Sequence, residues 1–111
     1  MKVTFGSTRL EKLLTDPVTR QRRLGAERGK KVLLRLTQMK VATDLGELSR
    51  LPQARCHQLG LDRDEQFSVD LDGPYRLILE VVDAPVPRLD DGGIDINAVK
   101  EVRIVEITDT H

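Results

Sequence analysis

Several features that would point to particular classes of protein are scarce in this sequence. Cys56 is the only cysteine among 111 residues, so no internal disulfide can form, which favours a reducing compartment. The only aromatic residues are Phe5, Phe67 and Tyr75, so the core must be built from aliphatic side chains. No apolar run is long enough to cross a bilayer, and none near Met1 is typical of a signal peptide. We therefore expect a protein of the cytoplasm.

The common cofactor and metal motifs are missing as well. One cysteine and two histidines cannot supply a self-contained Cys/His zinc site. Gly25 and Gly29 do not have the spacing of a phosphate-binding loop, and no Lys-Ser/Thr pair follows them. The aspartates of residues 90–95 lack the spacing and closing glutamate of a calcium-binding EF-hand loop. The sequence therefore predicts no cofactor and no bound metal.

A net charge of zero conceals an uneven distribution of charge along the chain. Residues 1–63 carry 14 Lys and Arg against 6 Asp and Glu, and residues 64–111 carry 4 against 12. One interpretation is a basic face that binds phosphates or an acidic partner. The other is that helix surfaces favour lysine and arginine whereas turns favour aspartate. Composition alone does not separate the two interpretations.

Helical signals dominate the first half of the chain. Thr8 and Glu11 form a potential capping box, and Asp16-Pro17 is typical of a helix start. From Lys30 onward, apolar residues recur at spacings of three and four and basic residues lie between them. The apolar set is Val32, Leu33, Leu36 and Met39, and the basic set is Lys30, Lys31, Arg35 and Lys40. This pattern predicts an amphipathic helix with a basic outer side, followed by a short turn of helix at 44–48.

Beyond Pro52 the pattern alternates, which is typical of strands. We expect strands at 55–59, 67–71, 75–82 and 99–107, with a turn at Asp72-Gly73-Pro74 and a long exposed loop at 84–97. Lys2 to Phe5 could add a short opening strand. The sequence therefore predicts one α+β domain, residues 1–111, with N-terminal helices packed on one face of an antiparallel sheet.

Three features could support chemistry. Arg76 follows a tight turn in an otherwise apolar strand, His111 lies two residues after Asp109 at the end of the last strand, and Arg63 lies in a turn. A guanidinium can bind phosphate with two hydrogen bonds, and an imidazole is suited to proton transfer near neutral pH. A lone strand arginine, however, is often the partner of a nearby carboxylate such as Glu80 or Asp70. A terminal histidine is usually idle, so both interpretations stay open.

Several short motifs occur in the order and spacing of a known family. These are Arg55-Cys56-His57-Gln58-Leu59, then Arg63, Phe67-Ser68-Val69, Pro74-Tyr75-Arg76-Leu77, and finally Glu106-Ile107-Thr108-Asp109-Thr110-His111. Together they make the chain resemble HigB-like toxins of the RelE/ParE superfamily over nearly its whole length. Three positions depart from the family pattern, which has Tyr at Thr110, Trp at Tyr75 and often Lys at Asp64.

This resemblance implies the toxin of a type II toxin–antitoxin pair, a ribosome-dependent endoribonuclease that cuts mRNA and inhibits translation without a metal. It implies catalytic roles for Arg76, His111 and Asp109. The residues expected to bind RNA are Arg63, Arg55, His57, Lys30, Lys31 and Arg35. The implied partners are the ribosome, mRNA and a HigA-like helix-turn-helix antitoxin, through which alone the chain would reach operator DNA.

Two other functions remain compatible with the sequence. A ParE-like inhibitor of DNA gyrase would share the fold but would not need His111. A binding module without catalysis, or a toxin that has lost its activity, would use its basic helices to dock an acidic partner. In that case Lys30, Lys31 and Arg35 would matter more than Arg76.

Overall fold

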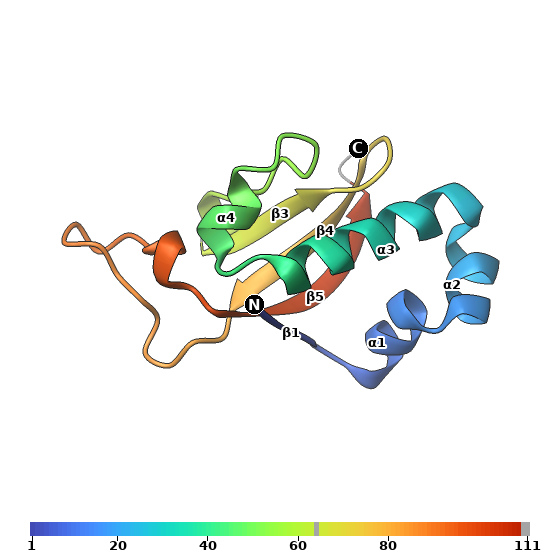
Figure 1. Cartoon of the computed structure of the whole chain (residues 1–111), viewed down its shortest axis with the longest axis horizontal. Coiled ribbons are helices and arrows are strands. Elements are labelled where there is room, and N and C mark those ends of the chain that lie inside the picture. The colour runs from blue at the N-terminus through green and yellow to red at the C-terminus, as the bar shows by residue number, and fades with distance from the viewer. Residues whose placement is uncertain (64, 110–111) are drawn as a thin grey trace.

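The computed structural model describes residues 1–63 and 65–109, in which an opening strand is followed by helices and then by the remaining strands (Figure 1). The helices are α1 (Thr8–Thr15), α2 (Pro17–Leu24), α3 (Ala26–Val41) and α4 (Leu45–Ser49). The strands are β1 (Lys2–Phe5), β2 (His57–Gln58), β3 (Gln66–Asp70), β4 (Tyr75–Val81) and β5 (Glu101–Asp109). Short 3₁₀ turns lie at Leu61–Arg63 and Ile96–Ala98. The predicted α+β class is confirmed.

The strands form one five-stranded sheet in the order β1-β5-β4-β3-β2. β2 to β5 are antiparallel neighbours, as the alternating pattern predicted, whereas β1 pairs with β5 in parallel. The sheet is therefore mixed rather than purely antiparallel. Parallel pairing is possible here because four helices and three strands separate β1 from β5 in the chain.

One face of the sheet is covered by helices and holds the core. α3 lies across this face, with the α1–α2 hairpin at one end of the molecule and the 84–97 loop at the other (Figure 1). The buried cluster is aliphatic apart from Phe67, Met39 and Cys56, as the lack of aromatics predicted. Its fully buried members include Leu14, Val32, Leu45, Leu48, Val69, Leu77, Leu79, Val102 and Ile104.

The short-range helix signals are accurate to within one residue. The Asp16 side chain accepts from the Thr19 N–H at the start of α2, and Asp44 accepts from the Glu47 N–H at the start of α4. The cap of α1 is Ser7 rather than Thr8, and it accepts from the Leu10 N–H. Gly25, with a φ of 83°, separates α2 from α3, a conformation that glycine adopts without a steric penalty.

Two expected elements differ from the structure. The strand expected at 55–59 is reduced to β2, His57–Gln58. Arg55 has a φ of 44°, which is not an extended conformation, so the strand cannot begin there. The loop at 84–97 is not fully exposed: Arg88 and Ile94 form a β-bridge, and Ile94 is buried in the core cluster. Within the described residues, no helix has the length and apolarity needed to span a membrane.

Candidate functional site

The sheet face turned away from the core is polar. Along β3 and β4, side chains alternate between the core and this second face, because successive residues of a strand point to opposite sides. Phe67, Val69, Leu77 and Leu79 belong to the core cluster. The residues that alternate or pair with them define what we call the polar sheet face: Gln66, Ser68, Asp70, Arg76, Ile78, Glu80, Arg103, Glu106 and Thr108. Arg76 therefore lies on the side opposite the helices.

Two arginines share one carboxylate at the end of this face. Arg76 and Asp70 are paired across β3 and β4, with Arg76 Nε 2.8 Å from Asp70 Oδ1. Arg55 Nε lies 3.6 Å from the other oxygen, Oδ2. The two salt-bridge partners Arg76 and Asp70 are largely shielded from solvent, whereas 72% of the Arg55 side chain is exposed. The group thus carries one more positive than negative charge, at a place that solvent reaches.

Further bonds fix the Arg76 guanidinium. Its Nη1 donates to the carbonyl oxygens of Gly73 and Tyr75, each at 2.8 Å. Of the two carboxylates expected as partners of Arg76, Glu80 and Asp70, the structure pairs it with Asp70. The guanidinium is held in one orientation by the turn that precedes β4, so its position does not depend on a ligand.

His57 is near this group but faces solvent. It is paired with Ser68 across β2 and β3, and its Nδ1 lies 2.9 Å from the carbonyl oxygen of Arg55. Both Arg55 and His57 are exposed. The structure therefore brings Arg55, His57, Asp70 and Arg76 to one edge of the sheet.

The other cations of the polar sheet face are also paired. Arg63 Nη1 donates to Glu106 Oε1 at 2.7 Å and to Gln66 Oε1 at 3.1 Å. Arg103 Nη2 donates to Glu80 Oε1 at 3.0 Å. Hydrogen bonds from Gln66, and then from Arg103, lower the pKa of the Glu80 carboxyl. Arg63 is thus available for RNA only if it leaves its carboxylate.

Of the three residues expected to be catalytic, Arg76 and Asp109 lie within the described residues. Thr108, not Asp109, lies opposite Arg76 in the sheet register. Asp109 lies opposite Tyr75, so strand alternation directs its side chain toward the face that holds the helices. His111, the other expected catalytic residue, lies outside the described residues, together with Thr110 and Asp64.

The helix cations do not join the same site. Lys30 and Lys31 belong to α3, on the other side of the sheet from Arg76. The prediction that Arg35 belongs to a basic outer side of α3 is wrong, because only 1% of this residue is exposed. Leu33, expected in the core, is instead 50% exposed.

Three hydrogen bonds account for the burial of Arg35. Nε donates to the Asp70 carbonyl at 2.7 Å, Nη2 to the Gln53 carbonyl at 2.8 Å, and Nη1 to Gln38 Oε1 at 3.0 Å. Burial lowers the pKa of this guanidinium, and the charge of Asp70 opposes that change. Arg35 therefore ties α3 to β3 and to the segment before β2, and it has no route to an RNA backbone.

Sequence reasoning missed a second arrangement, around Tyr75. The Arg28 guanidinium lies 3.5 Å from the centroid of the Tyr75 ring, and its Nε donates to Asp72 Oδ1 at 3.0 Å. This cation–π contact occupies a face of the ring. Tyr75 thus fastens α3 to the turn before β4, a role that no local signal in the sequence indicates.

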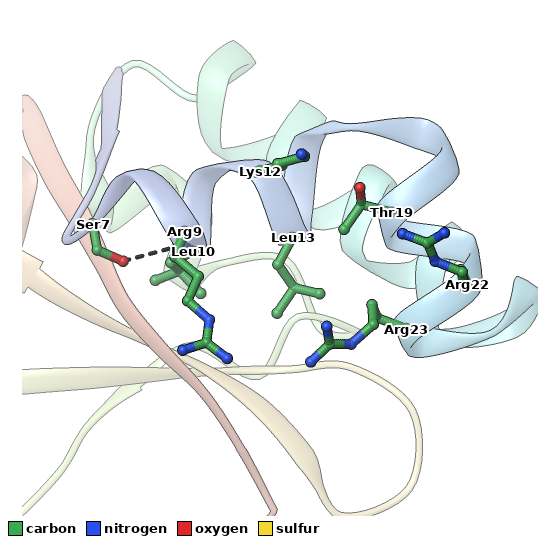
Figure 2. A pocket seen from close by; sticks show the side chains of 8 residues that line it. All are labelled: Ser7, Arg9, Leu10, Lys12, Leu13, Thr19, Arg22 and Arg23. Atoms are coloured by element: carbon green, nitrogen blue, oxygen red, sulfur yellow. Dashed lines mark hydrogen bonds between the residues drawn. The ribbon is translucent and has the colours of Figure 1, made fainter.

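A groove between α1 and α2 was also missed. It has a volume of about 360 Å³ and is lined by Ser7, Arg9, Leu10, Lys12, Leu13, Thr19, Arg22 and Arg23. In Figure 2, Arg9, Leu10 and Leu13 from α1 point to the same side as Arg23 from α2. Leu10, Leu13 and Leu14 have the spacing of one helical face, but of these only Leu14 is fully buried.

The described residues contain no group of three or more His, Cys, Asp or Glu side chains that could hold a metal ion. Burial raises the pKa of the Cys56 thiol to about 11, which leaves little thiolate for nucleophilic chemistry near neutral pH. No family model matches the chain, and no curated protein is significantly similar to it. On the sheet, the arrangement best suited to a ligand is the group of Arg55, His57, Asp70 and Arg76, because two guanidinium groups meet there at a place that solvent reaches.

Proposed function

We propose that this chain is the toxin of a type II toxin–antitoxin pair and cleaves RNA at the edge of its polar sheet face. One observation carries the proposal: Arg76 and Arg55 converge on the single carboxylate of Asp70. A phosphate that displaces or joins Asp70 would meet two guanidinium groups, the side chains best suited to binding phosphate oxygens in pairs. The motifs shared with HigB-like toxins support the same assignment.

The proposed reaction needs only groups of the protein and the RNA. The ribose 2′-oxygen attacks the adjacent phosphorus, and its proton passes to a base. The bond from phosphorus to the 5′-oxygen then breaks, and that oxygen takes up a proton from an acid. Arg76, already oriented by Gly73 and Tyr75, would oppose the negative charge that builds up on the pentacovalent phosphate.

The remaining roles follow from position. His111 is assigned the proton transfers, on the resemblance alone. Asp109 would assist His111, as the resemblance implies, although in the register it lies opposite Tyr75 rather than Arg76. Arg55 and His57 are exposed beside Arg76 and would hold the RNA, whereas Arg63 must first release Glu106. Lys30 and Lys31 would contact a more distant part of a large partner, and Arg35 is withdrawn from the RNA-binding set.

The proposal includes the setting that the resemblance implies. The substrate would be mRNA on the ribosome in the cytoplasm, and the inhibitor a HigA-like helix-turn-helix antitoxin that also carries the operator contacts. The alternative of a binding module without catalysis has one observation in its favour. Each arginine of the polar sheet face already has a carboxylate partner, so the site resembles a stabilising network as much as a phosphate site.

The test is to induce the wild type, Arg76→Ala and Arg103→Ala in cells without antitoxin, and to follow growth and map mRNA ends. Arg103 is a matched control, because it is also an arginine of the polar sheet face bound to a carboxylate. We expect growth arrest and discrete mRNA cuts from the wild type and Arg103→Ala, and neither from Arg76→Ala. Thermal unfolding of the purified variants must show that both are folded.

Each other outcome has a distinct meaning. Arrest with intact mRNA would contradict RNA cleavage and favour the gyrase-type function. Equal toxicity of Arg76→Ala and the wild type would remove Arg76 from the active site. An absence of arrest from all three proteins would favour the binding module.

A further inference from the structure

The groove between α1 and α2 combines apolar and cationic side chains. Leu10 and Leu13, three residues apart on α1, are only partly buried and form its apolar floor. The charged residues of its lining are all cations, Arg9 and Lys12 from α1 and Arg22 and Arg23 from α2. A second hollow shares Arg22 and adds Val18, which is 69% exposed. The apolar surface therefore continues along the outer side of α2.

The cations of this groove differ from those of the sheet in forming no salt bridge within the described residues. Across residues 1–63 and 65–109, no ion pair involves Arg9, Lys12, Arg22 or Arg23. The nearby Asp16 is bonded to the N–H and hydroxyl of Thr19, which lowers the pKa of its carboxyl and keeps it engaged at the start of α2. Four positive charges thus surround two leucines without a salt bridge, although the charge of Lys12 also lowers the pKa of the Asp16 carboxyl.

We infer that this groove binds an acidic peptide segment of a protein partner, one that carries leucine-like side chains between its carboxylates. The leucines would bury apolar side chains of the peptide, and the four cations would pair with its carboxylates. Charge complementarity is the basis for this choice of occupant. Single-stranded RNA fits less well, because the lining contains no aromatic side chain on which bases could stack, whereas its two leucines match the apolar side chains of a peptide.

The inference is independent of RNA cleavage. It concerns α1 and α2 and none of the residues assigned to the polar sheet face, and its readout is binding rather than growth or mRNA integrity. Loss of the nuclease proposal would leave it intact, and the reverse also holds.

The experiment selects peptides from a displayed library of random 14-residue segments, with the full-length wild-type protein as bait. Two variants remove the charge of the groove, Arg9→Glu/Arg23→Glu and Lys12→Glu/Arg22→Glu. The matched control is Lys2→Glu/Lys40→Glu, which makes the same change of net charge at two exposed lysines outside the groove. Thermal unfolding checks the fold of every variant, and fluorescence anisotropy measures the affinity of the selected peptides and of a 12-nucleotide single-stranded RNA.

We expect enriched peptides that combine aspartate or glutamate with leucine or isoleucine. Their Kd should rise about tenfold or more with each groove variant and should stay within about twofold for the control, because a tenfold change requires only 1.4 kcal/mol. Binding should also weaken with added salt, as for exposed charge pairs.

Four results would overturn the inference. These are the absence of enrichment, enrichment of peptides without acidic residues, binding that survives both groove variants, and RNA binding that the groove variants abolish while peptides fail to bind. Sedimentation of the wild type tests the remaining candidate for the occupant of the groove, a second copy of the chain. Asp90→Lys/Asp91→Lys reverses two acidic charges of the 84–97 loop. If the protein self-associates, and both the groove variants and this loop variant lose that self-association, the occupant of the groove is the 84–97 loop of another protomer.

Discussion

The polar sheet face and the α1–α2 hairpin both carry arginines, but the two regions use them differently. On the sheet, the guanidinium groups of Arg55, Arg63, Arg76 and Arg103 lie between 2.7 and 3.6 Å from a carboxylate oxygen. On the hairpin, the four cations of the groove form no salt bridge within the described residues. The arginines of the sheet are therefore paired with carboxylates, whereas the cations of the groove remain without salt bridges.

This difference separates charges that serve the fold from charges that remain for a partner. An ion pair on a protein surface contributes about 0–1 kcal/mol, but it fixes the orientation of both side chains. A solvated cation contributes nothing measurable to folding and keeps its charge for an incoming ligand. Substitutions should therefore affect stability on one side of the comparison and binding on the other.

The largest effect is expected at Arg35, which belongs to neither of the two regions. Arg35→Met keeps much of the volume but leaves the carbonyls of Gln53 and Asp70 without their donor. Because each buried carbonyl left without a donor costs about 1–3 kcal/mol, we expect a loss of about 2–5 kcal/mol in the free energy of unfolding, measured by urea titration. Lys40→Met, on the exposed side of α3, is the control and should change it by less than about 0.5 kcal/mol. A loss below about 1 kcal/mol would show that the three bonds do not stabilise the fold.

Asp70→Asn tests the carboxylate that two arginines share. It removes the charge that holds Arg76 and Arg55, and we expect it to reduce the free energy of unfolding by about 1–2 kcal/mol. The same change frees two guanidinium groups, so affinity for a short RNA should rise at low salt. If RNA affinity falls while the protein stays folded, Asp70 contributes to binding and the shared-carboxylate interpretation is wrong.

The contribution of Glu80 to the free energy of unfolding should depend on pH. Its folded-state pKa is lowered by Gln66 and Arg103, so its stabilising contribution is present above its ordinary pKa of 4.5 and is lost as pH falls through the lowered value. Glu80→Gln should therefore be less stable than the wild type at pH 7, by less than about 1 kcal/mol because the pair is partly exposed. The difference should shrink below about pH 4.5. Unfolding titrations at several pH values measure it, and a difference that does not change with pH would contradict this assignment.

The smallest effect is expected on the hairpin. Arg9→Gln and Arg23→Gln remove cations that are exposed and have no ion-pair partner among the described residues. The free energy of unfolding should change by no more than about 0.5 kcal/mol for each, as for most surface substitutions. A loss near that of Asp70→Asn would mean that these cations serve the fold, and it would remove the contrast between the regions.

Local signals predicted most of the fold, since they depend on neighbours in sequence. Asp16-Pro17 starts a helix through contacts within three residues, and the pairing of Arg76 with Asp70 follows from one tight turn. The burial of Arg35 and the exposure of Leu33 could not be predicted, because a periodic pattern assigns every charged residue to the outer side of a helix and every apolar residue to its inner side. The burial of Arg35 depends on carbonyls 18 and 35 residues away.

The two candidate sites also differ in how far local signals in the sequence predicted them. The group at the sheet edge was partly predicted, because Arg55, His57 and Arg76 lie in motifs with recognisable order and spacing. The α1–α2 groove was not, because it depends on how two helices pack rather than on either helix alone. Leu10 and Leu13 have the spacing of core residues, and only the packing of α2 leaves them partly open.

The bonds of Arg35 have a consequence for how this protein can change over evolution. Two of its three acceptors are main-chain carbonyls, a group that every amino acid provides. Position 53 can therefore accept almost any residue without loss of the bond, whereas position 35 requires a side chain with several fixed donors, which only arginine offers. Among descendants of a common ancestor, an invariant arginine at position 35 should accompany a freely varying residue at position 53.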